Sequence, residues 1–216
     1  MYVRIYYRNK EYNKFIKNNA ILKNININLE KGKCYGFVGT NGSGKSMLFK
    51  AICGLIKSNE GYIKVNGKII GKDVDFPSNV GALIEYPGFL GNFSGLQNLK
   101  YLAAINNKIT DEEIIKFMVL LDLDPNDKKK VKNYSLGMKQ RLGIIQAIME
   151  NPSIVILDEP MNALDKNGID LVRGIIKNMK SQGKTILLAS HNVMDINLLC
   201  DEIFEFNLGV LEKINS

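Results

Sequence analysis

The stretch that decides the fold is Gly39 to Ser46, which reads G-T-N-G-S-G-K-S. The segment before it, Lys33–Val38, is short, apolar and β-prone, which predicts a buried strand, and Ser46–Leu55 has apolar residues at helical spacing. The glycines therefore belong to a strand-to-helix turn, where positive φ angles let backbone N–H groups approach an anion. In this setting the loop predicts phosphate binding, whereas the same glycines without a flanking strand and helix would indicate an ordinary turn.

The loop also predicts roles for particular side chains. We expect Lys45 to reach the β- and γ-phosphate oxygens of a nucleotide and the Ser46 hydroxyl to ligate Mg²⁺. Successive backbone N–H groups and the N-terminus of the following helix should face the phosphates. The expected ATP-binding residues of this segment are Gly39, Thr40, Asn41, Gly42, Ser43, Gly44, Lys45, Ser46 and Met47.

A second cluster lies at residues 154–160, which read I-V-I-L-D-E-P. Four residues typical of a buried strand end in two acids, which places the acids at the carboxyl edge of a parallel sheet, where ligands bind. We expect Asp158 to hold Mg²⁺ through its water shell and Glu159 to polarise the attacking water. Such acids would be unremarkable on a surface turn, but beside a phosphate-binding loop they indicate nucleotide hydrolysis.

Strand and helix patterns alternate along most of the chain. Residues 20–29 alternate as a half-buried strand, and residues 61–70 predict a hairpin around Asn66-Gly67. Residues 153–206 read strand, helix, strand, short helix, strand. The sequence therefore predicts an α/β core.

One helical stretch interrupts this alternation. Ser94 and Thr110 each begin a capping-box pattern followed by apolar residues at helical spacing. Ser135 is expected to cap a further helix that ends near residue 149, before Asn151-Pro152. We predict a single domain over residues 1–216, with a helical subdomain inserted at about residues 88–150.

Length and composition fit a protein of one domain. At 216 residues, 45% of them hydrophobic, the chain can bury a substantial core. Its apolar runs are far shorter than the ~20 residues that cross a bilayer, and its N-terminus lacks the apolar stretch of a signal peptide. Cys34, Cys53 and Cys200 are odd in number and scattered, which predicts reduced cytosolic thiols and no metal site.

The net charge of +7 is ambiguous, because it fits either nucleic acid or an anionic membrane surface. Its densest run, Lys128–Lys132, follows Pro125 and predicts a solvated loop. No aromatic-interleaved basic patch or nucleic-acid-binding module accompanies it, so no nucleic-acid partner is expected.

With the loop and the paired acids, the segment Asn133–Arg141 (N-Y-S-L-G-M-K-Q-R) resembles the nucleotide-binding subunit of ABC (ATP-binding cassette) transporters, essentially from end to end. The resemblance implies a P-loop NTPase (RecA-like) α/β core with an N-terminal antiparallel β-subdomain and an inserted helical subdomain. It implies that Ser135 and Gly137 contact the γ-phosphate of ATP held by the opposite subunit. Leu136 and Met138 depart from the common Ser-Gly-Gly-Gln form, and this version resembles a subgroup of bacterial exporters.

Further matches follow in the chain. After Asn162, the segment Ala163-Leu164-Asp165 resembles the D-loop that crosses the dimer interface, and His191 falls where the switch histidine contacts the γ-phosphate. Lys45, Glu159 and His191 are thus the expected catalytic residues. The family stacks an aromatic on adenine near the N-terminus; Phe15 is the candidate, Tyr12 is its rival, and a core aromatic is the alternative for either.

The chain departs from the family at the Q-loop. The expected glutamine should follow the strand near residues 80–84, but Glu85 stands in its place. A carboxylate can still ligate Mg²⁺, so the predicted metal site comprises Ser46, Asp158 and Glu85. Gln97 comes too late in the chain to substitute.

Two functions remain open. The first is an ATPase that dimerises on binding ATP, as a homodimer or with a second cassette, and drives separate transmembrane permease subunits from the cytoplasmic face of the membrane. Its cargo, by analogy with export and self-immunity systems, is an antimicrobial peptide or drug. The second is a soluble ABC-type ATPase that acts on ribosomes or DNA, although such relatives generally have paired cassettes or a long coiled coil.

Overall fold

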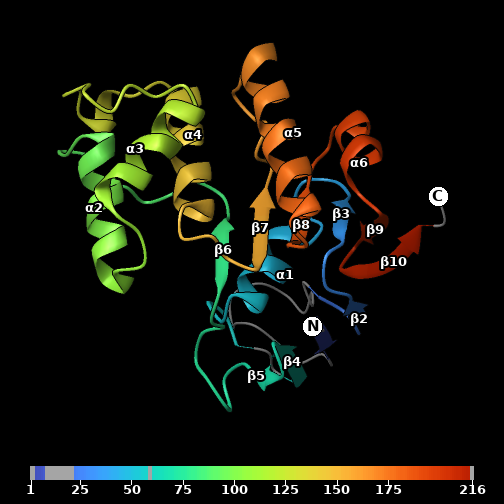
Figure 1. Cartoon of the computed structure of the whole chain (residues 1–216). Helices are drawn as coiled ribbons and strands as arrows, with labels where there is room; N and C mark the ends of the chain where they lie inside the picture. Colours follow the sequence, from blue (N-terminus) through green and yellow to red (C-terminus); the bar gives the residue numbers. More distant parts are fainter. Residues whose placement is uncertain (1–2, 8–21, 58–59, 215–216) are drawn as a thin grey trace, which may run out of the picture.

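The structure is a computed structural model that describes residues 3–7, 22–57 and 60–214. Figure 1 shows a central sheet, a smaller sheet below it and a group of helices beyond one edge. The central sheet has the strand order β10-β9-β3-β8-β7-β6 and is parallel except for the β9–β10 pair. Its strands are β3 (Cys34–Val38), β6 (Val80–Leu83), β7 (Ile154–Asp158), β8 (Thr185–Ala189), β9 (Glu202–Asn207) and β10 (Val210–Ile214).

The smaller sheet is antiparallel and has the order β2-β1-β4-β5. The predicted hairpin is confirmed, with φ of 50° at Asn66 and 83° at Gly67, the positive angles that a tight turn requires. The strand predicted over residues 20–29 is shorter, because Asn24 takes a φ of 48° and breaks the extended chain. The strands are β1 (Val3–Tyr7), β2 (Asn26–Leu29), β4 (Gly61–Val65) and β5 (Lys68–Ile69).

Both faces of the central sheet are covered, so its middle strands are buried. β7 and β8 are buried along their whole length. In β3, Cys34 packs toward α4, α5 and α6, whereas Tyr35 and Phe37 pack toward α1 and the smaller sheet. The covering helices are α1 (Lys45–Ile52), α4 (Leu136–Ile148), α5 (Lys166–Ser181) and α6 (Val193–Leu199).

The inserted helical subdomain lies beyond β6 (Figure 1) and contains α2 (Gly95–Asn106), α3 (Asp111–Leu120) and α4. Both predicted capping boxes are confirmed: the side chains of Ser94 and Thr110 accept hydrogen bonds from backbone N–H groups three residues on. Ser135 caps α4, as predicted. The limits at residues 88 and 150 stay a prediction.

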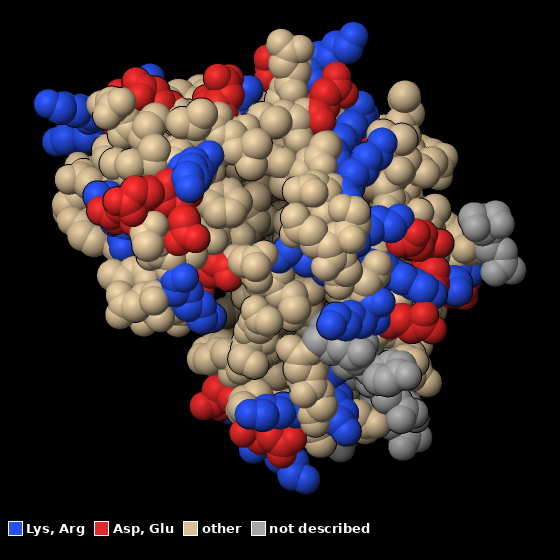
Figure 2. All heavy atoms as spheres, in the orientation of Figure 1, with Lys and Arg blue, Asp and Glu red and all other residues tan. Residues whose placement is uncertain are grey.

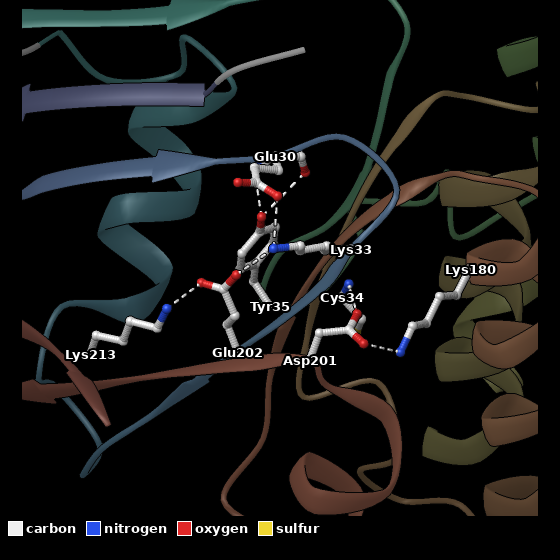
Figure 3. A network of polar contacts seen from close by, with 8 residues as sticks. All are labelled: Glu30, Lys33, Cys34, Tyr35, Lys180, Asp201, Glu202 and Lys213. Carbon is white, nitrogen blue, oxygen red and sulfur yellow. Dashed lines mark hydrogen bonds and ion pairs between the residues drawn. The ribbon is translucent and has the colours of Figure 1, made fainter. Parts of the chain in front are cut away.

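A hydrogen-bonded ion-pair network joins the N-terminal ends of β3 and β9 (Figure 3). Lys33 Nζ lies 2.7 Å from Glu30 Oε2 and 2.8 Å from Glu202 Oε1, and Lys213 Nζ lies 2.9 Å from Glu202 Oε2. Hydrogen bonds from Lys33 and then Lys213 lower the pKa of Glu202. The network ties β3, β9 and β10 together at one end, while the C-terminal end of β3 leads into the Gly-rich loop.

The cysteines are not all scattered, which corrects the prediction. Cys34 and Cys200 are 166 positions apart in sequence, yet their Sγ atoms lie 3.7 Å apart. They meet because β3, which begins at Cys34, and β9, which begins two residues after Cys200, are neighbours in the sheet. All three cysteines, Cys53 included, are free thiols.

Charges of both signs are mixed on the face of the molecule that Figure 2 shows. Figure 2 shows lysine and arginine interspersed with aspartate and glutamate on the visible face. Lys128, Lys129 and Lys130 lie exposed after α3, as predicted, but Val131 is buried and begins a short 3-10 helix (Val131–Asn133), so the predicted solvated loop is shorter. None of the described helices is long and apolar enough to cross a membrane.

Candidate functional site

The Gly-rich loop forms the turn between β3 and α1, as the sequence predicts. Gly39, Gly42 and Gly44 have φ angles of 141°, 78° and 122°, which favour glycine. At Gly39 a Cβ atom would also lie 2.6 Å from the carbonyl oxygen of Phe206, so no larger residue fits. Gly44 caps α1 without a side chain, so the first N–H groups of the helix are left for a ligand.

The two loop side chains with predicted roles, Lys45 and Ser46, are held by hydrogen bonds. Lys45 is 7% exposed, and its Nζ donates to the carbonyl oxygens of Gly39 (2.7 Å) and Thr40 (3.2 Å). The Ser46 hydroxyl donates to Asp158 Oδ2 at 2.5 Å. The Ser43 hydroxyl is buried and has no partner among the described residues. The loop thus presents an ammonium group and an unpaired hydroxyl.

The paired acids stand at the C-terminal end of β7, as predicted. Burial raises the pKa of Asp158, while the hydrogen bond from Ser46 and the charge of Lys45 oppose the shift. At Glu159 the chain turns with a φ of 50°, and its N–H donates to the carbonyl oxygen of Ala189 at the end of β8. Asp158 thus contacts the Gly-rich loop, whereas the backbone of Glu159 is tied to the end of β8.

His191 lies against Glu159. Its Nδ1 is 2.8 Å from Glu159 Oε2, and the imidazole side chain is 67% exposed. The helix that follows, α6, is anchored by Asp195, which is 1% exposed and lies 2.5 Å from Arg173 Nη2 on α5. Arg173 also contacts the exposed Asp170 at 3.0 Å. The buried ion pair thus fixes the helix that begins just after His191.

Glu85 lies in the cavity wall, but its carboxylate pairs with a lysine. Its Oε1 is 2.7 Å from Lys50 Nζ on α1, and its side chain is 55% exposed. Its backbone, with a φ of 55°, hydrogen-bonds to Asp158. The segment after β6 therefore reaches the predicted metal site through its main chain.

Most of these groups line one cavity of about 710 Å³, but Gly39, Thr40 and His191 are not among its lining residues. The lining residues are Asn41, Gly42, Ser43, Gly44, Lys45, Ser46, Met47, Glu85, Tyr86, Gln140, Asp158, Glu159 and Asn162. Sequence reasoning missed Tyr86 and Gln140. Gln140 is 8% exposed and donates to the carbonyl oxygen of Glu159 at 3.0 Å. The sequence did contain one signal for Gln140, namely a polar residue on the face of α4 that is otherwise apolar and buried.

The residues at the start of α4 do not line this cavity. The Ser135 hydroxyl accepts from the N–H of Met138 at 3.1 Å, and Ser135 and Leu136 are exposed. Gly137 lies so close to the segment after β7 that a Cβ atom would be 2.8 Å from the carbonyl oxygen of Ala163. Ser135 and Gly137 are therefore not part of the wall of the cavity that contains Lys45. Phe15 and Tyr12 lie outside the described residues.

The parallel sheet, the Gly-rich loop that leads into α1 and the acids at the end of β7 define a P-loop NTPase. A solved dimeric ATP-binding cassette, MJ0796 in a post-hydrolysis state bound to ADP and Pi, has the same fold. The TM-score is 0.84 at 20% identity, covering 100% of this chain and 99% of that one.

Sequence comparison identifies the family within the P-loop NTPases to which the chain belongs. Residues 22–162 match the family described as ABC transporter. The chain is 44% identical, over 92% of its length and 91% of the relative's, to the uncharacterized ABC transporter ATP-binding protein YybJ of Bacillus subtilis. It is 38% identical, over 90% of its length and 84% of the relative's, to the lantibiotic transport ATP-binding protein SrtF of Streptococcus pyogenes. The chain therefore belongs to the ABC transporter family, as an ATP-binding subunit with ATPase activity.

Proposed function

We propose that two copies of this chain close on two MgATP molecules and that hydrolysis reopens them, driving separate transmembrane subunits. The observation that carries this proposal is the position of Ser135 and Gly137. They belong to the family's signature segment, yet they lie outside the cavity that holds Lys45 and Asp158. A second copy would bring its α4 N-terminus, with free N–H groups and a positive dipole end, to the γ-phosphate.

Within one copy, the loop residues Gly39 to Met47 would hold the phosphates. The Lys45 ammonium, now on two loop carbonyls, would exchange these contacts for β- and γ-phosphate oxygens. The unpaired hydroxyl of Ser43 would donate to the same oxygens. Adenine would stack on an aromatic, for which Phe15 remains the candidate.

The metal site suits Mg²⁺. The Ser46 hydroxyl and Asp158 carboxylate, 2.5 Å apart, supply the hard oxygen ligands that this ion takes in proteins. Bound there, Mg²⁺ would neutralise charge on the phosphates. Glu85 would join only after release from Lys50.

Glu159 and His191 would act on the attacking water and the γ-phosphate. The carboxylate of Glu159 accepts from His191 in this structure, so the two side chains already face each other. We assign Glu159 to polarising the water, because it follows the metal-binding acid by one residue. His191, largely exposed, would contact the γ-phosphate and report its presence to α6.

The partners would be transmembrane permease subunits, which would hold the chain at the cytoplasmic face of the membrane. The family assignment supports a transport role, and the similarity to a lantibiotic transport subunit favours an antimicrobial peptide or drug as cargo. An affinity-tagged chain should retrieve integral membrane proteins from detergent-solubilised membranes. Retrieval of ribosomal proteins or DNA instead would overturn this assignment.

Mixing two inactive variants tests the shared site. Lys45→Ala and Ser135→Arg should each abolish hydrolysis. In a mixed dimer one site would carry both defects and the other neither, so mixing should restore up to about a quarter of wild-type activity, from half of the dimers with one intact site.

A second mixture provides the control. Lys45→Ala with Glu159→Gln should recover nothing, because both defects lie on the loop side of a site and each site of the mixed dimer would keep one. No recovery in the first mixture, with subunit exchange verified by differently tagged copies, would exclude a shared site between identical subunits.

A further inference from the structure

A pair of thiols lies at the end of the sheet opposite the nucleotide cavity. Cys34 is the first residue of β3 and is fully buried, while Cys200 directly follows α6 and is partly exposed. Their Sγ atoms are 3.7 Å apart, with the Cys34 thiol donating to Cys200. A disulfide requires the sulfur atoms to approach by about a further 1.7 Å, to the usual bond length.

The neighbouring backbone holds the two cysteines in register. The N–H of Cys34 donates to Asp201 Oδ2 at 2.8 Å, and the N–H of Asp201 donates to the carbonyl oxygen of Cys34 at 2.7 Å. Lys180 secures the same carboxylate, with its Nζ 2.5 Å from Asp201 Oδ1 (Figure 3). Because Asp201 directly follows Cys200, both sides of the pair are clamped and closure needs mainly side-chain rotation.

A glycine makes room for the second sulfur. A Cβ atom on Gly36 would lie 3.0 Å from Cys200 Sγ and 3.1 Å from Ile196 Cγ2. The thiol of Cys200 therefore packs directly on the backbone of β3, two residues beyond Cys34. This close approach holds the sulfur beside its partner.

We propose that Cys34 and Cys200 form an oxidisable dithiol, which hydrogen peroxide converts to an intramolecular disulfide. The sulfur of Cys200, the accessible member, attacks one peroxide oxygen; the O–O bond breaks, giving a sulfenic acid and one water. The sulfur of Cys34 then attacks the Cys200 sulfur; the S–S bond forms, the S–O bond breaks and the thiol proton leaves with the hydroxyl as a second water. Two electrons pass from the thiols to the peroxide.

Cys34 does not compete with Cys200 for peroxide. The hydrogen bond to Cys200, followed by burial, raises the pKa of Cys34, so its reactive thiolate form is disfavoured and Cys200 is the member that is oxidised first. Cys53 differs from Cys34 in the cause of its shift, because burial alone raises the pKa of Cys53 to about 12. The disulfide would join the strand that feeds the Gly-rich loop to the helix that follows His191.

Peptide mapping tests the proposal. The reduced full-length chain is exposed to graded hydrogen peroxide, alkylated under denaturing conditions and digested without reductant. We expect a linked Cys34–Cys200 peptide pair that is lighter by two hydrogens and disappears with dithiothreitol, while Cys53 remains alkylated. On a non-reducing gel the oxidised chain should run as a monomer.

Variants separate this outcome from general oxidation. Cys53→Ser should form the same linked pair at the wild-type rate. Cys34→Ala, whose folding is checked by circular dichroism, should instead accumulate sulfinic acid on Cys200. Oxidation of wild-type Cys200 to sulfinic or sulfonic acid without the linked pair would overturn the proposal, as would loss of Cys53 alkylation at the same rate.

Discussion

Gly81 tests how closely β6 packs on α4. A Cβ atom at this position would lie 1.7 Å from the carbonyl oxygen of Ala147 and 2.8 Å from Cγ of Pro152. Contacts below 3.0 Å essentially never occur for a real Cβ atom, and the nearest obstacle is backbone. Gly81→Ala must therefore push β6 and α4 apart by more than 1 Å, since no side chain can rotate to relieve the contact with Ala147.

The cost follows from this geometry. Inserting a carbon into a packed core costs typically about 1–3 kcal/mol, and a clash with backbone places Gly81→Ala at the upper end. In a chain of this size each kcal/mol lowers the melting temperature by about 2–4 °C, so a fall of about 6–12 °C is expected. β6 leads to Glu85, and α4 begins directly after its N-cap Ser135. Because both elements would be displaced, ATPase activity should fall as well.

Thermal unfolding followed by circular dichroism measures the effect. Gly174→Ala is the matched control, because Gly174 lies within α5 and a Cβ atom there meets nothing within 4 Å. That variant should gain about 0.5–1 kcal/mol from the better helix former. A Gly81→Ala variant that melts within about 2 °C of wild type would refute the packing described here.

Three further variants test the site and its support. Glu159→Gln should lower kcat by roughly 10² and let ATP trap a dimer in size-exclusion chromatography; normal turnover would place the base elsewhere. Lys50→Met frees the carboxylate of Glu85, so half-maximal hydrolysis should need less Mg²⁺; an unchanged Mg²⁺ titration would separate Glu85 from the metal. Asp195→Asn removes the buried counter-charge of Arg173 and should lower the free energy of unfolding in urea by about 3 kcal/mol. Asp170→Asn removes the exposed partner of the same arginine and should lower it by less than about 1 kcal/mol. Equal losses in the two variants would contradict the burial argument.

Features that depend on neighbouring residues were predictable from the sequence. The side-chain caps at Ser94, Thr110 and Ser135 each join atoms three residues apart, so the local pattern contains all the information needed. The positive φ angles of the Gly-rich loop follow from glycine itself. The hairpin to β10 was missed although Leu208-Gly209, at φ of 46° and 85°, forms a similar turn.

The sequence by itself determined the alternating strands and helices, the phosphate-binding loop and the acids at the end of β7, because these depend on periodicity, caps and turn chemistry within short segments. Only the tertiary structure decided that Glu85 pairs with Lys50, that Gln140 reaches the backbone of Glu159 and that Cys34 meets Cys200. Each of these contacts joins segments on different elements. Strand order and helix packing determine which of these side chains meet, because they bring residues from distant sequence positions together. A local sequence pattern does not contain that information.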